Sequence, residues 1–292
     1  MKVTTEFKGN YPEDPIRFFN FDELVNGIDD IGLYYGLGSH TLNNGEKFRI
    51  YLDLEEPLLL SHNILTYHKN FHKILTLCPF SAEWYNNQIG EKKVAATYFP
   101  FNPQFTPETE VNKEYDVIYT GSGGSPEIKS VLEIMGKFNH KHVGFDSPTE
   151  PGCSYKRKLK LIAQSKITIV HNLFFFNDQW KQKTKEYDRS DNKAYEKVQE
   201  LGLVPHLKSR SFEPAFCRSL MLVRKDPWNV IEKYFKPNVH FIYYEDGKLD
   251  KTIEYFLKNY GQVQDIIENA YKHANKHYTT NRFFKDYIND RF

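Results

Sequence analysis

The chain has 292 residues, of which 40% are hydrophobic and 16% aromatic, and its 39 basic and 38 acidic residues leave a formal net charge of +1. This length and composition predict about two globular domains with ample material for buried cores. The near balance of charge argues against a general nucleic-acid binder and against a polybasic protein of the membrane surface.

In the first half of the chain, helices and strands alternate irregularly. The predicted elements are a short helix at residues 21–28 and strands at residues 31–38, 47–57 and 73–78. A helix follows at residues 81–89, with Ser81 as its N-cap. Residues 93–116 lack periodicity and contain three prolines, which predicts an interdomain linker.

The second half shows a more regular pattern. A β-branched strand at residues 115–120 leads through a Gly/Ser turn into an amphipathic helix. The later predicted elements are strands at residues 140–145, 166–172 and 240–246 and helices at residues 154–165, 248–260 and 262–278. The charged segment 174–200 predicts surface helix and loop. This alternation predicts a parallel sheet with helices on both faces.

Cysteine usage and hydropathy indicate the compartment. Cys78, Cys153 and Cys217 are too widely spaced for a disulfide framework or a CxxC metal site, which favours a reducing environment. The amino-terminal stretch MKVTTEFKGNYPEDP lacks the apolar core of a signal peptide. No stretch approaches the ~20 apolar residues of a membrane-spanning helix. We therefore expect a cytoplasmic protein without a transmembrane segment.

The turn YTGSGG after the strand at residues 115–120 is a candidate anion site. The backbone N–H groups of such a turn point outward, and the following helix favours a phosphate at its amino end. The candidate donor-binding residues are Gly121, Ser122, Gly123 and Gly124. The motif is neither GxGxxG nor a Walker loop, so a tight turn without a ligand stays open as the alternative.

The stretch HLKSRSFEPAF places two cations and a carboxylate close together, at Lys208, Arg210 and Glu213. A guanidinium matches phosphate oxygens, an ammonium adds a point charge, and a carboxylate can accept both hydroxyls of a ribose. This set indicates a nucleoside diphosphate site, in which Glu213→Ala is expected to weaken nucleotide binding and leave the fold intact. The alternative is a surface ion pair at a helix start.

Acidic residues follow the strand at residues 47–57. Asp53 and Glu55 form a D-x-D-like pair that could hold a divalent cation on a diphosphate. Glu55 or Glu56 could instead be a general base for an acceptor hydroxyl, or both could be solvated acids. The pairs His68/His72 and His273/His277 have the spacing of metal ligands but no third ligand nearby in sequence, which favours surface histidines.

Taken in order, these pieces resemble the glycosyltransferase module of spore-maturation (CgeB-like) proteins, within the glycosyl transferases group 1 family. The resemblance covers residue 48 to the end of the chain. The segments that carry it are YLDLEEP, LTLCPFSAEWYNN, YFPFNPQFTP, YDVIYTGSGG, SKITIVHN, KSRSFEPAFCRSLML, HFIYYED and AYKHANKHYTTNRFFKDYI.

The resemblance implies an α/β fold of the GT-B type, with two Rossmann-like domains facing a cleft and the amino-terminal one reduced. Residues 1–110 would form the acceptor-side domain and residues 111–292 the domain that binds the nucleotide sugar. By position, Glu213 would bind the ribose, and Arg210 and Lys208 would bind the diphosphate. Asn172 and Tyr244 would border the donor. Cys217 and Arg218 depart from the small residue and glycine that are usual there.

The predicted function is sugar transfer from a nucleoside diphosphate sugar to a glycan hydroxyl, with no cofactor and no metal ion. The sugar would be a hexose or deoxyhexose, and inversion or retention stays open. The predicted catalytic residues are Arg210, Lys208, Glu55 and Glu56. Alternatives are a non-catalytic nucleotide-sugar or glycan-binding module, a D-x-D-type metal-dependent transferase, and a nucleotide-sugar-modifying enzyme such as an epimerase.

Overall fold

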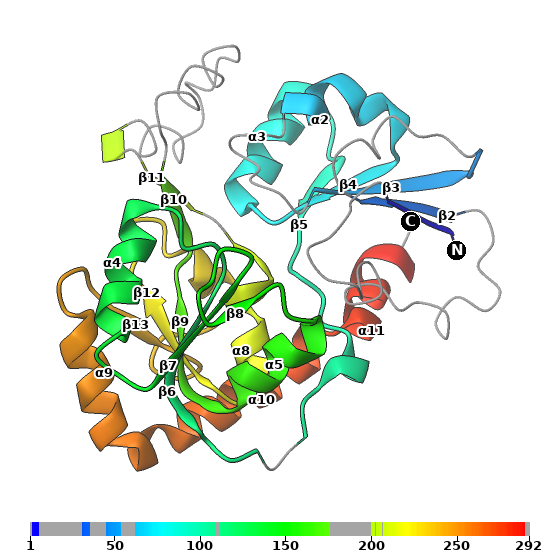
Figure 1. Cartoon of the computed structure of the whole chain (residues 1–292). Coiled ribbons are helices and arrows are strands. Elements are labelled where there is room, and N and C mark those ends of the chain that lie inside the picture. The colour runs from blue at the N-terminus through cyan, green and yellow to red at the C-terminus, as the bar shows by residue number, and fades with distance from the viewer. Residues whose placement is uncertain are drawn as a thin grey trace. The chain divides into compact units, whose positions relative to one another are not determined.

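The structure is a computed structural model of the chain (Figure 1). It describes residues 2–5, 31–35, 45–53, 62–108, 111–175, 200–201, 203–205 and 207–289. By packing contacts the chain forms two units. The first holds Met1–Lys8, Phe21–Phe99 and Leu173–Lys208, and the second holds Gly9–Asn20, Pro100–Asn172 and Ser209–Phe292. The predicted boundary between residues 110 and 111 stays a prediction, because packing alone does not define domains along a sequence.

The first unit is built on a parallel sheet of five strands in the order β1-β2-β3-β4-β5. The strands are β1 (Lys2–Thr5), β2 (Ile31–Tyr35), β3 (Phe48–Asp53), β4 (Lys73–Thr76) and β5 (Val94–Ala96), with helices α2 (His62–Tyr67) and α3 (Pro79–Ile89). The predicted strands β2, β3 and β4 are therefore confirmed. The predicted helix at residues 21–28 lies outside the described residues.

Aromatic side chains form much of the core of the first unit. Tyr34, Phe71 and Tyr85 are buried together with Trp84 and Val94. Helix α3 begins at Pro79, and its N-cap is Cys78, so the prediction of Ser81 as the cap was wrong. The reason is that proline fits the first turn of a helix, where an N–H has no partner, and this allows the helix to start earlier.

The predicted linker at residues 93–116 contains more structure than its composition suggests. Strand β5 continues the first sheet, so this part of the prediction was wrong. Further along, Phe101 is buried and its ring stacks on that of Phe216, with centroids 4.0 Å apart. Phe101 N–H also donates to the carbonyl of Tyr278. Three prolines removed the periodic signal, but burial of the intervening aromatic residues orders the segment.

The second unit is built on six strands in the parallel order β13-β12-β9-β6-β7-β8. The strands are β6 (Tyr115–Thr120), β7 (His140–Gly144), β8 (Glu150–Pro151), β9 (Ser165–Val170), β12 (Leu220–Arg224) and β13 (Ile242–Tyr244). The helices are α4 (Pro126–Met135), α5 (Tyr155–Ala163), α8 (Glu213–Phe216), α9 (Leu249–Lys258), α10 (Gln264–His277) and α11 (Thr280–Phe283). A short antiparallel pair, β10 (Leu173–Phe175) and β11 (Leu203–Pro205), belongs to the first unit.

Helices cover both faces of this larger sheet, as the alternating pattern predicted (Figure 1). Helices α4 and α9 bury Val131, Met135 and Ile253 against Val117 and Leu222 of the sheet. Helices α5 and α8 pack on the opposite face. Ser125 caps α4 and Ser154 caps α5 through their side-chain oxygens. Because all six strands are parallel, the loops that follow β6, β7, β9, β12 and β13 meet at one edge of the sheet.

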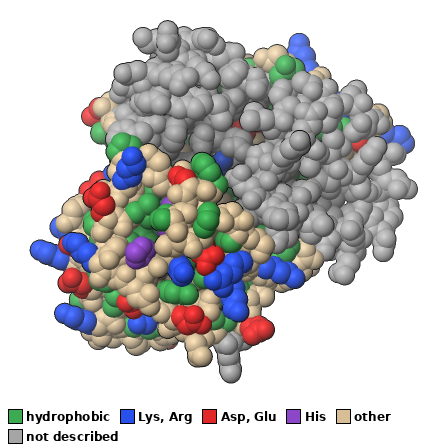
Figure 2. Space-filling view, in the orientation of Figure 1, with side chains coloured by type: hydrophobic (Ala, Val, Ile, Leu, Met, Phe, Trp, Pro, Cys, Tyr) green, Lys and Arg blue, Asp and Glu red, His purple; other side chains and the backbone are tan. Residues whose placement is uncertain are grey.

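Within the described part of the chain, no helix is long and apolar enough to cross a membrane. On the visible described surface, Lys and Arg side chains are interspersed with Asp and Glu and do not gather into one basic face (Figure 2). This surface gives no support for nucleic-acid binding, which uses clustered positive charge. The expected cytoplasmic location and the absence of a nucleic-acid partner stay predictions.

Candidate functional site

The turn after β6 lies at the carboxyl edge of the larger sheet. Its first residue, Gly121, has a φ of +143°, a conformation that favours glycine. Gly121 N–H donates to the carbonyl of Val143 at 2.8 Å, and its own carbonyl accepts from Nε2 of His142 at 2.8 Å. Gly144 also approaches closely, because a Cβ there would lie 2.3 Å from the Gly121 oxygen. Because both residues are glycines, the backbone of β7 can approach the turn closely.

A carboxylate of the chain itself fills this turn. Gly123 N–H lies 3.1 and 2.9 Å from the two carboxylate oxygens of Asp146, and the Ser122 hydroxyl donates to Oδ2 at 2.8 Å. Partial burial opposes ionisation of Asp146, but the hydrogen bonds from Gly123 and Ser122 outweigh it and lower the pKa of this carboxyl. In this structure the chain's own carboxylate occupies the turn, and donor binding by Gly121, Ser122, Gly123 and Gly124 stays a prediction.

Arg210 reaches the same turn from a short 3-10 helix, Ser209–Ser211. A Cβ built on Gly121 would lie 2.8 Å from Nη1 of Arg210 and 2.9 Å from the hydroxyl of Tyr119, so the guanidinium lies against the turn. The hydroxyl of Tyr119 is buried, and burial raises its pKa, while the positive charge of Arg210 opposes the rise. Arg210 and the glycine turn, which were both predicted to bind the donor, therefore lie together.

Glu213 has a different environment from the one that a ribose contact needs. It is the first residue of α8 and only 1% exposed. Its Oε2 lies 2.5 Å from Nζ of Lys158, which is on α5 and also buried. Glu213 is thus half of a buried ion pair between two helices. Its role in binding a ribose stays a prediction, and the alternative of a surface ion pair is wrong because both partners are buried.

Asn172 and Tyr244 lie at the carboxyl ends of β9 and β13 and are fully or almost fully buried. Asn172 Nδ2 donates to Oδ2 of Asp226 at 2.8 Å, whereas its Oδ1 has no hydrogen-bond partner among the described residues. The hydroxyl of Tyr244 has none within the same set. Burial raises the pKa of this hydroxyl well above its usual range. Both side chains therefore hold a buried polar atom that a ligand could satisfy.

An arginine that the sequence analysis did not select shares this edge. Arg224 ends β12 and makes two hydrogen bonds to Asp246, from Nε at 2.8 Å and Nη2 at 2.6 Å. Its Nη1 donates to Nε2 of His171 at 3.1 Å. Asp146, His171, Arg224, Asp226 and Asp246 each follow or end a strand of the larger sheet or lie within two residues of its end. The rule that ligands bind beyond the carboxyl ends of parallel strands could have identified them.

The remaining predicted residues belong to the first unit or lie outside the described residues. Lys208 is half-exposed and is grouped with the first unit. Glu55 and Glu56 lie outside the described residues. Asp53 ends β3 and is buried. Over the described ranges, no three His, Cys, Asp or Glu side chains gather in a way that could hold a metal ion.

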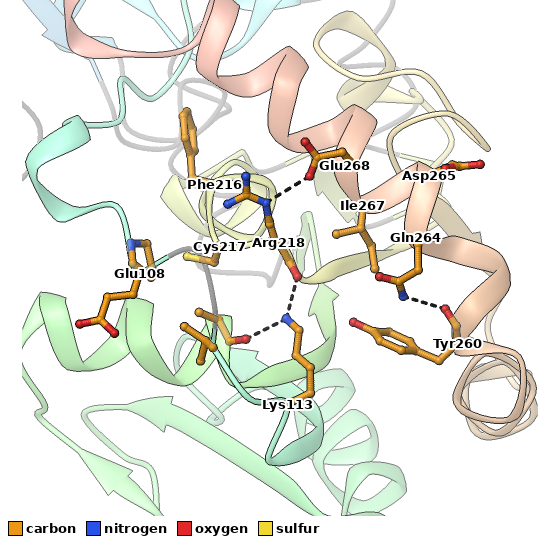
Figure 3. A pocket seen from close by; sticks show the side chains of 13 residues that line it. Glu108, Lys113, Phe216, Cys217, Arg218, Tyr260, Gln264, Asp265, Ile267 and Glu268 are labelled. Atoms are coloured by element: carbon orange, nitrogen blue, oxygen red, sulfur yellow. Dashed lines mark hydrogen bonds and ion pairs between the residues drawn. The ribbon is translucent and has the colours of Figure 1, made fainter.

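The opposite, amino edge of the larger sheet has a pocket of about 330 Å³ (Figure 3). Lys113 lies in its wall and donates from Nζ to the carbonyls of Ala163, Ser165 and Arg218, at 2.7, 3.1 and 2.7 Å. Burial lowers the pKa of Lys113 to about 8. Because three carbonyls take up its three N–H groups, Lys113 ties together the segments that lead into β6, β9 and β12.

Cys217 and Arg218, which depart from the residues usual in the resembled family, also line this pocket. Arg218 has a φ of +49°, the left-handed conformation that glycine adopts without strain. Its guanidinium pairs with Glu268 at 3.2 Å and lies 3.4 Å from the ring centroid of Tyr271. These two residues precede β12, so they lie at the other edge of the sheet from the glycine turn.

Comparisons with known proteins identify a family and several similar folds. Residues 131–289, over half of the chain, match the model of a family described as "Glycosyl transferase-like". None of the curated proteins matches the sequence significantly. Among solved structures, a mutant of TarM from S. aureus, in complex with UDP among other ligands, is similar at a TM-score of 0.58 and 9% identity, covering 92% of this chain and 57% of that one. This chain thus spans a little over half the length of that protein.

Two further structures are similar over most of this chain. Anabaena HepE, in complex with UDP and glucose, has a TM-score of 0.54 and 10% identity, covering 88% of this chain and 76% of that one. The pneumococcal O-GlcNAc transferase GtfA, in complex with UDP and GlcNAc, has a TM-score of 0.52 and 10% identity, with 92% and 58% coverage. At these identities the likeness is one of fold.

The fold is α/β with parallel sheets and is that of GT-B glycosyltransferases, which confirms the predicted fold class. The chain belongs to the glycosyl transferase-like family. The predicted resemblance is thereby confirmed at the level of this family, and the CgeB-like subgroup stays a prediction.

Proposed function

We propose that this chain transfers a hexose or deoxyhexose from a nucleoside diphosphate sugar to a hydroxyl group of a glycan, without a bound metal ion. The observation that carries the proposal is the position of Arg210 against Gly121, at the edge where open α/β sheets bind their ligands. Membership of the glycosyl transferase-like family supports sugar transfer as the reaction class.

In the proposed reaction, the bond between the anomeric carbon and the β-phosphate oxygen breaks as the acceptor oxygen bonds to that carbon. Negative charge grows on the departing diphosphate. Arg210 offers two parallel N–H donors to the phosphate oxygens, and Lys208 supplies a second positive charge. Fixed positive groups that face developing charge are usually the largest contribution to the rate.

The acceptor hydroxyl must lose its proton during the transfer. If the reaction inverts the anomeric centre, the proposed base is Glu55 or Glu56, which follow Asp53 at the end of β3. If the reaction retains the configuration, no such base is needed. In the proposed site Asn172 Oδ1 and the hydroxyl of Tyr244 take part in binding the donor.

Glu213 favours a second candidate function, a module that binds a nucleotide sugar or glycan without turnover. Oε2 of Glu213 is engaged with Lys158 in a buried ion pair, which leaves this carboxylate less available to a ribose diol. A module of this kind would bind a nucleoside diphosphate at the same edge and show no sugar transfer.

Thermal unfolding with UDP-, GDP-, dTDP- and CMP-sugars separates these functions. A donor that binds the folded state raises the Tm by mass action and identifies the nucleotide class. Release of the nucleotide from that sugar donor is then measured with a glycan acceptor, with and without EDTA. We expect a Tm shift and turnover that EDTA leaves unchanged. Binding without turnover supports the second candidate, EDTA-sensitive turnover supports a D-x-D-type transferase, and no shift with any donor contradicts the proposal.

A further inference from the structure

The internal carboxylate in the glycine turn has the contacts of a bound phosphate. Both oxygens of Asp146 face Gly123 N–H, and the Ser122 hydroxyl donates to one of them. Gly124 N–H in turn donates to Ser122 Oγ at 3.3 Å, which directs the hydroxyl hydrogen toward the carboxylate. Glycine turns of this kind bind phosphates through such N–H and O–H donors. A phosphate and Asp146 would therefore need the same donors.

The loop that carries Asp146 is held by other residues. Ser147 Oγ donates to the carbonyl of His142 at 2.5 Å, and Thr149 Oγ1 donates to the same carbonyl at 2.8 Å. Ser147 N–H donates to the carbonyl of Gly144 at 3.2 Å. Because these bonds do not involve the Asp146 side chain, that side chain can leave the turn while the loop keeps its path. Asp146 is also exposed, so rotation into solvent meets little steric resistance.

Arg210 and Asp146 act on the turn with opposite charges. Arg210 lies against Gly121, and both Arg210 and Asp146 are close enough to perturb the hydroxyl of Tyr119 electrostatically. An incoming diphosphate is attracted by Arg210, whereas Asp146 repels it and occupies the donors of Ser122 and Gly123. The two residues therefore set the affinity for phosphate in opposite directions.

We propose that Asp146 is an internal competitor for the donor diphosphate, which closes the glycine turn in the free protein and has to move out before a phosphate can bind there. The proposal rests on the proposed function, since it concerns the same donor site. As a consequence, the protein would bind the nucleoside diphosphate that is left after transfer more weakly. Asp146 thus favours release of this product.

The test is titration calorimetry with UDP, GDP, dTDP and inorganic pyrophosphate on the wild-type chain, Asp146→Ala and Asp146→Asn. Asp146→Ala opens the turn and removes the charge, so we expect affinity for the bound nucleotide or pyrophosphate to rise about tenfold. Asp146→Asn removes the charge but keeps an acceptor for Ser122, so a smaller rise is expected. Asp116→Asn is the matched control, because Asp116 pairs with Lys166 at the other end of β6.

Unchanged or weaker affinity in both Asp146 variants, with a Tm close to that of the wild type, overturns the proposal. If the wild type binds a nucleotide but the variants do not tighten it, the competitor role fails and the proposed function stands. If no nucleotide binds but Asp146→Ala gains pyrophosphate binding, the competitor role stands and the nucleotide donor fails. If no ligand binds any variant, both are rejected. An equal rise with Asp116→Asn also overturns the proposal, because it indicates a general charge effect.

Discussion

Lys158 and Glu213 join helices α5 and α8 through a contact of 2.5 Å between Nζ and Oε2, and their side chains are only 5% and 2% exposed. In a buried pair of this kind, mutual attraction opposes the cost of removing both charges from water. Loss of one partner removes the ion pair from a charge that is still buried. The pair therefore affects folding more directly than ligand binding.

We expect Glu213→Gln to lower the free energy of unfolding by about 3 to 5 kcal/mol, as for other broken buried pairs. Urea denaturation measures this loss. The double variant Glu213→Leu with Lys158→Met removes both charges and should recover much of the stability. A loss below about 1 kcal/mol in Glu213→Gln would contradict this account, since it is the value typical of an exposed pair.

The outcome for Glu213 illustrates what the sequence could and could not predict. Local patterns sufficed for the glycine turn and for the strands and helices around it, because a strand, a turn and a capped helix follow one another directly. Pairing of Glu213 with Lys158 depends on packing between α5 and α8, which are about 50 residues apart in the sequence. Lys158 lies in a run of basic residues that composition alone assigns to a solvated face. The same holds for Asp146, whose partners precede it by more than 20 residues.

Arg210 should affect turnover more strongly than Arg218, which lies at the other edge of the sheet. Under the proposed function, Arg210→Ala removes a group that faces developing charge, so kcat should fall about 10²- to 10³-fold. Arg210→Lys should recover part of the rate. Initial-rate measurements with the donor found by thermal shift test this.

The matched control for Arg210 is Arg218→Ala. Arg218 pairs with Glu268 near the amino edge of the sheet, so turnover measured well below the Tm should stay near that of the wild type. A near wild-type rate in Arg210→Ala, or equal losses in both variants, would count against the role of Arg210.

Gly144→Ala should disturb the contact between β7 and the glycine turn. The added Cβ would lie 2.3 Å from the backbone oxygen of Gly121, so one of the two segments must shift. We expect a loss of about 1 to 3 kcal/mol in the free energy of unfolding, as for other overpacked sites. Gly261→Ala is the control, because no atom lies within 4 Å of a Cβ there. Equal stability of the two variants would show that the turn accommodates a side chain at Gly144.

A column of imidazoles should make the stability of the second unit depend on pH. The rings of His240 and His273 are stacked with their centroids 4.3 Å apart, and the ring centroid of His277 lies 4.7 Å from that of His273. Burial lowers the pKa of His240 to about 4, and the charges of His273 and Lys236 act in the same direction. His273 and His277 are both partly exposed, which does not contradict the prediction of surface histidines.

Because the folded protein keeps His240 neutral, the unfolded chain binds more protons between pH of about 6.5 and 4. Stability should be retained above this window and fall as the pH decreases through it. Urea midpoints measured from pH 7.5 to 4 test this. His240→Asn keeps an acceptor for Lys236 N–H and should flatten the dependence, whereas His140→Asn serves as the control outside the column. A His240→Asn profile that matches the wild type would refute the assignment.

Within the described residues, the chain passes between the two packing units at Phe99–Pro100, Asn172–Leu173 and Lys208–Ser209. No single break can therefore separate the units, and a fragment that starts at residue 111 would carry Leu173–Lys208 away from the unit with which it packs. A chimera with a relative would therefore have to exchange each unit as several separate segments. A single crossover near the middle of the sequence would separate the β10–β11 pair from the unit to which it belongs.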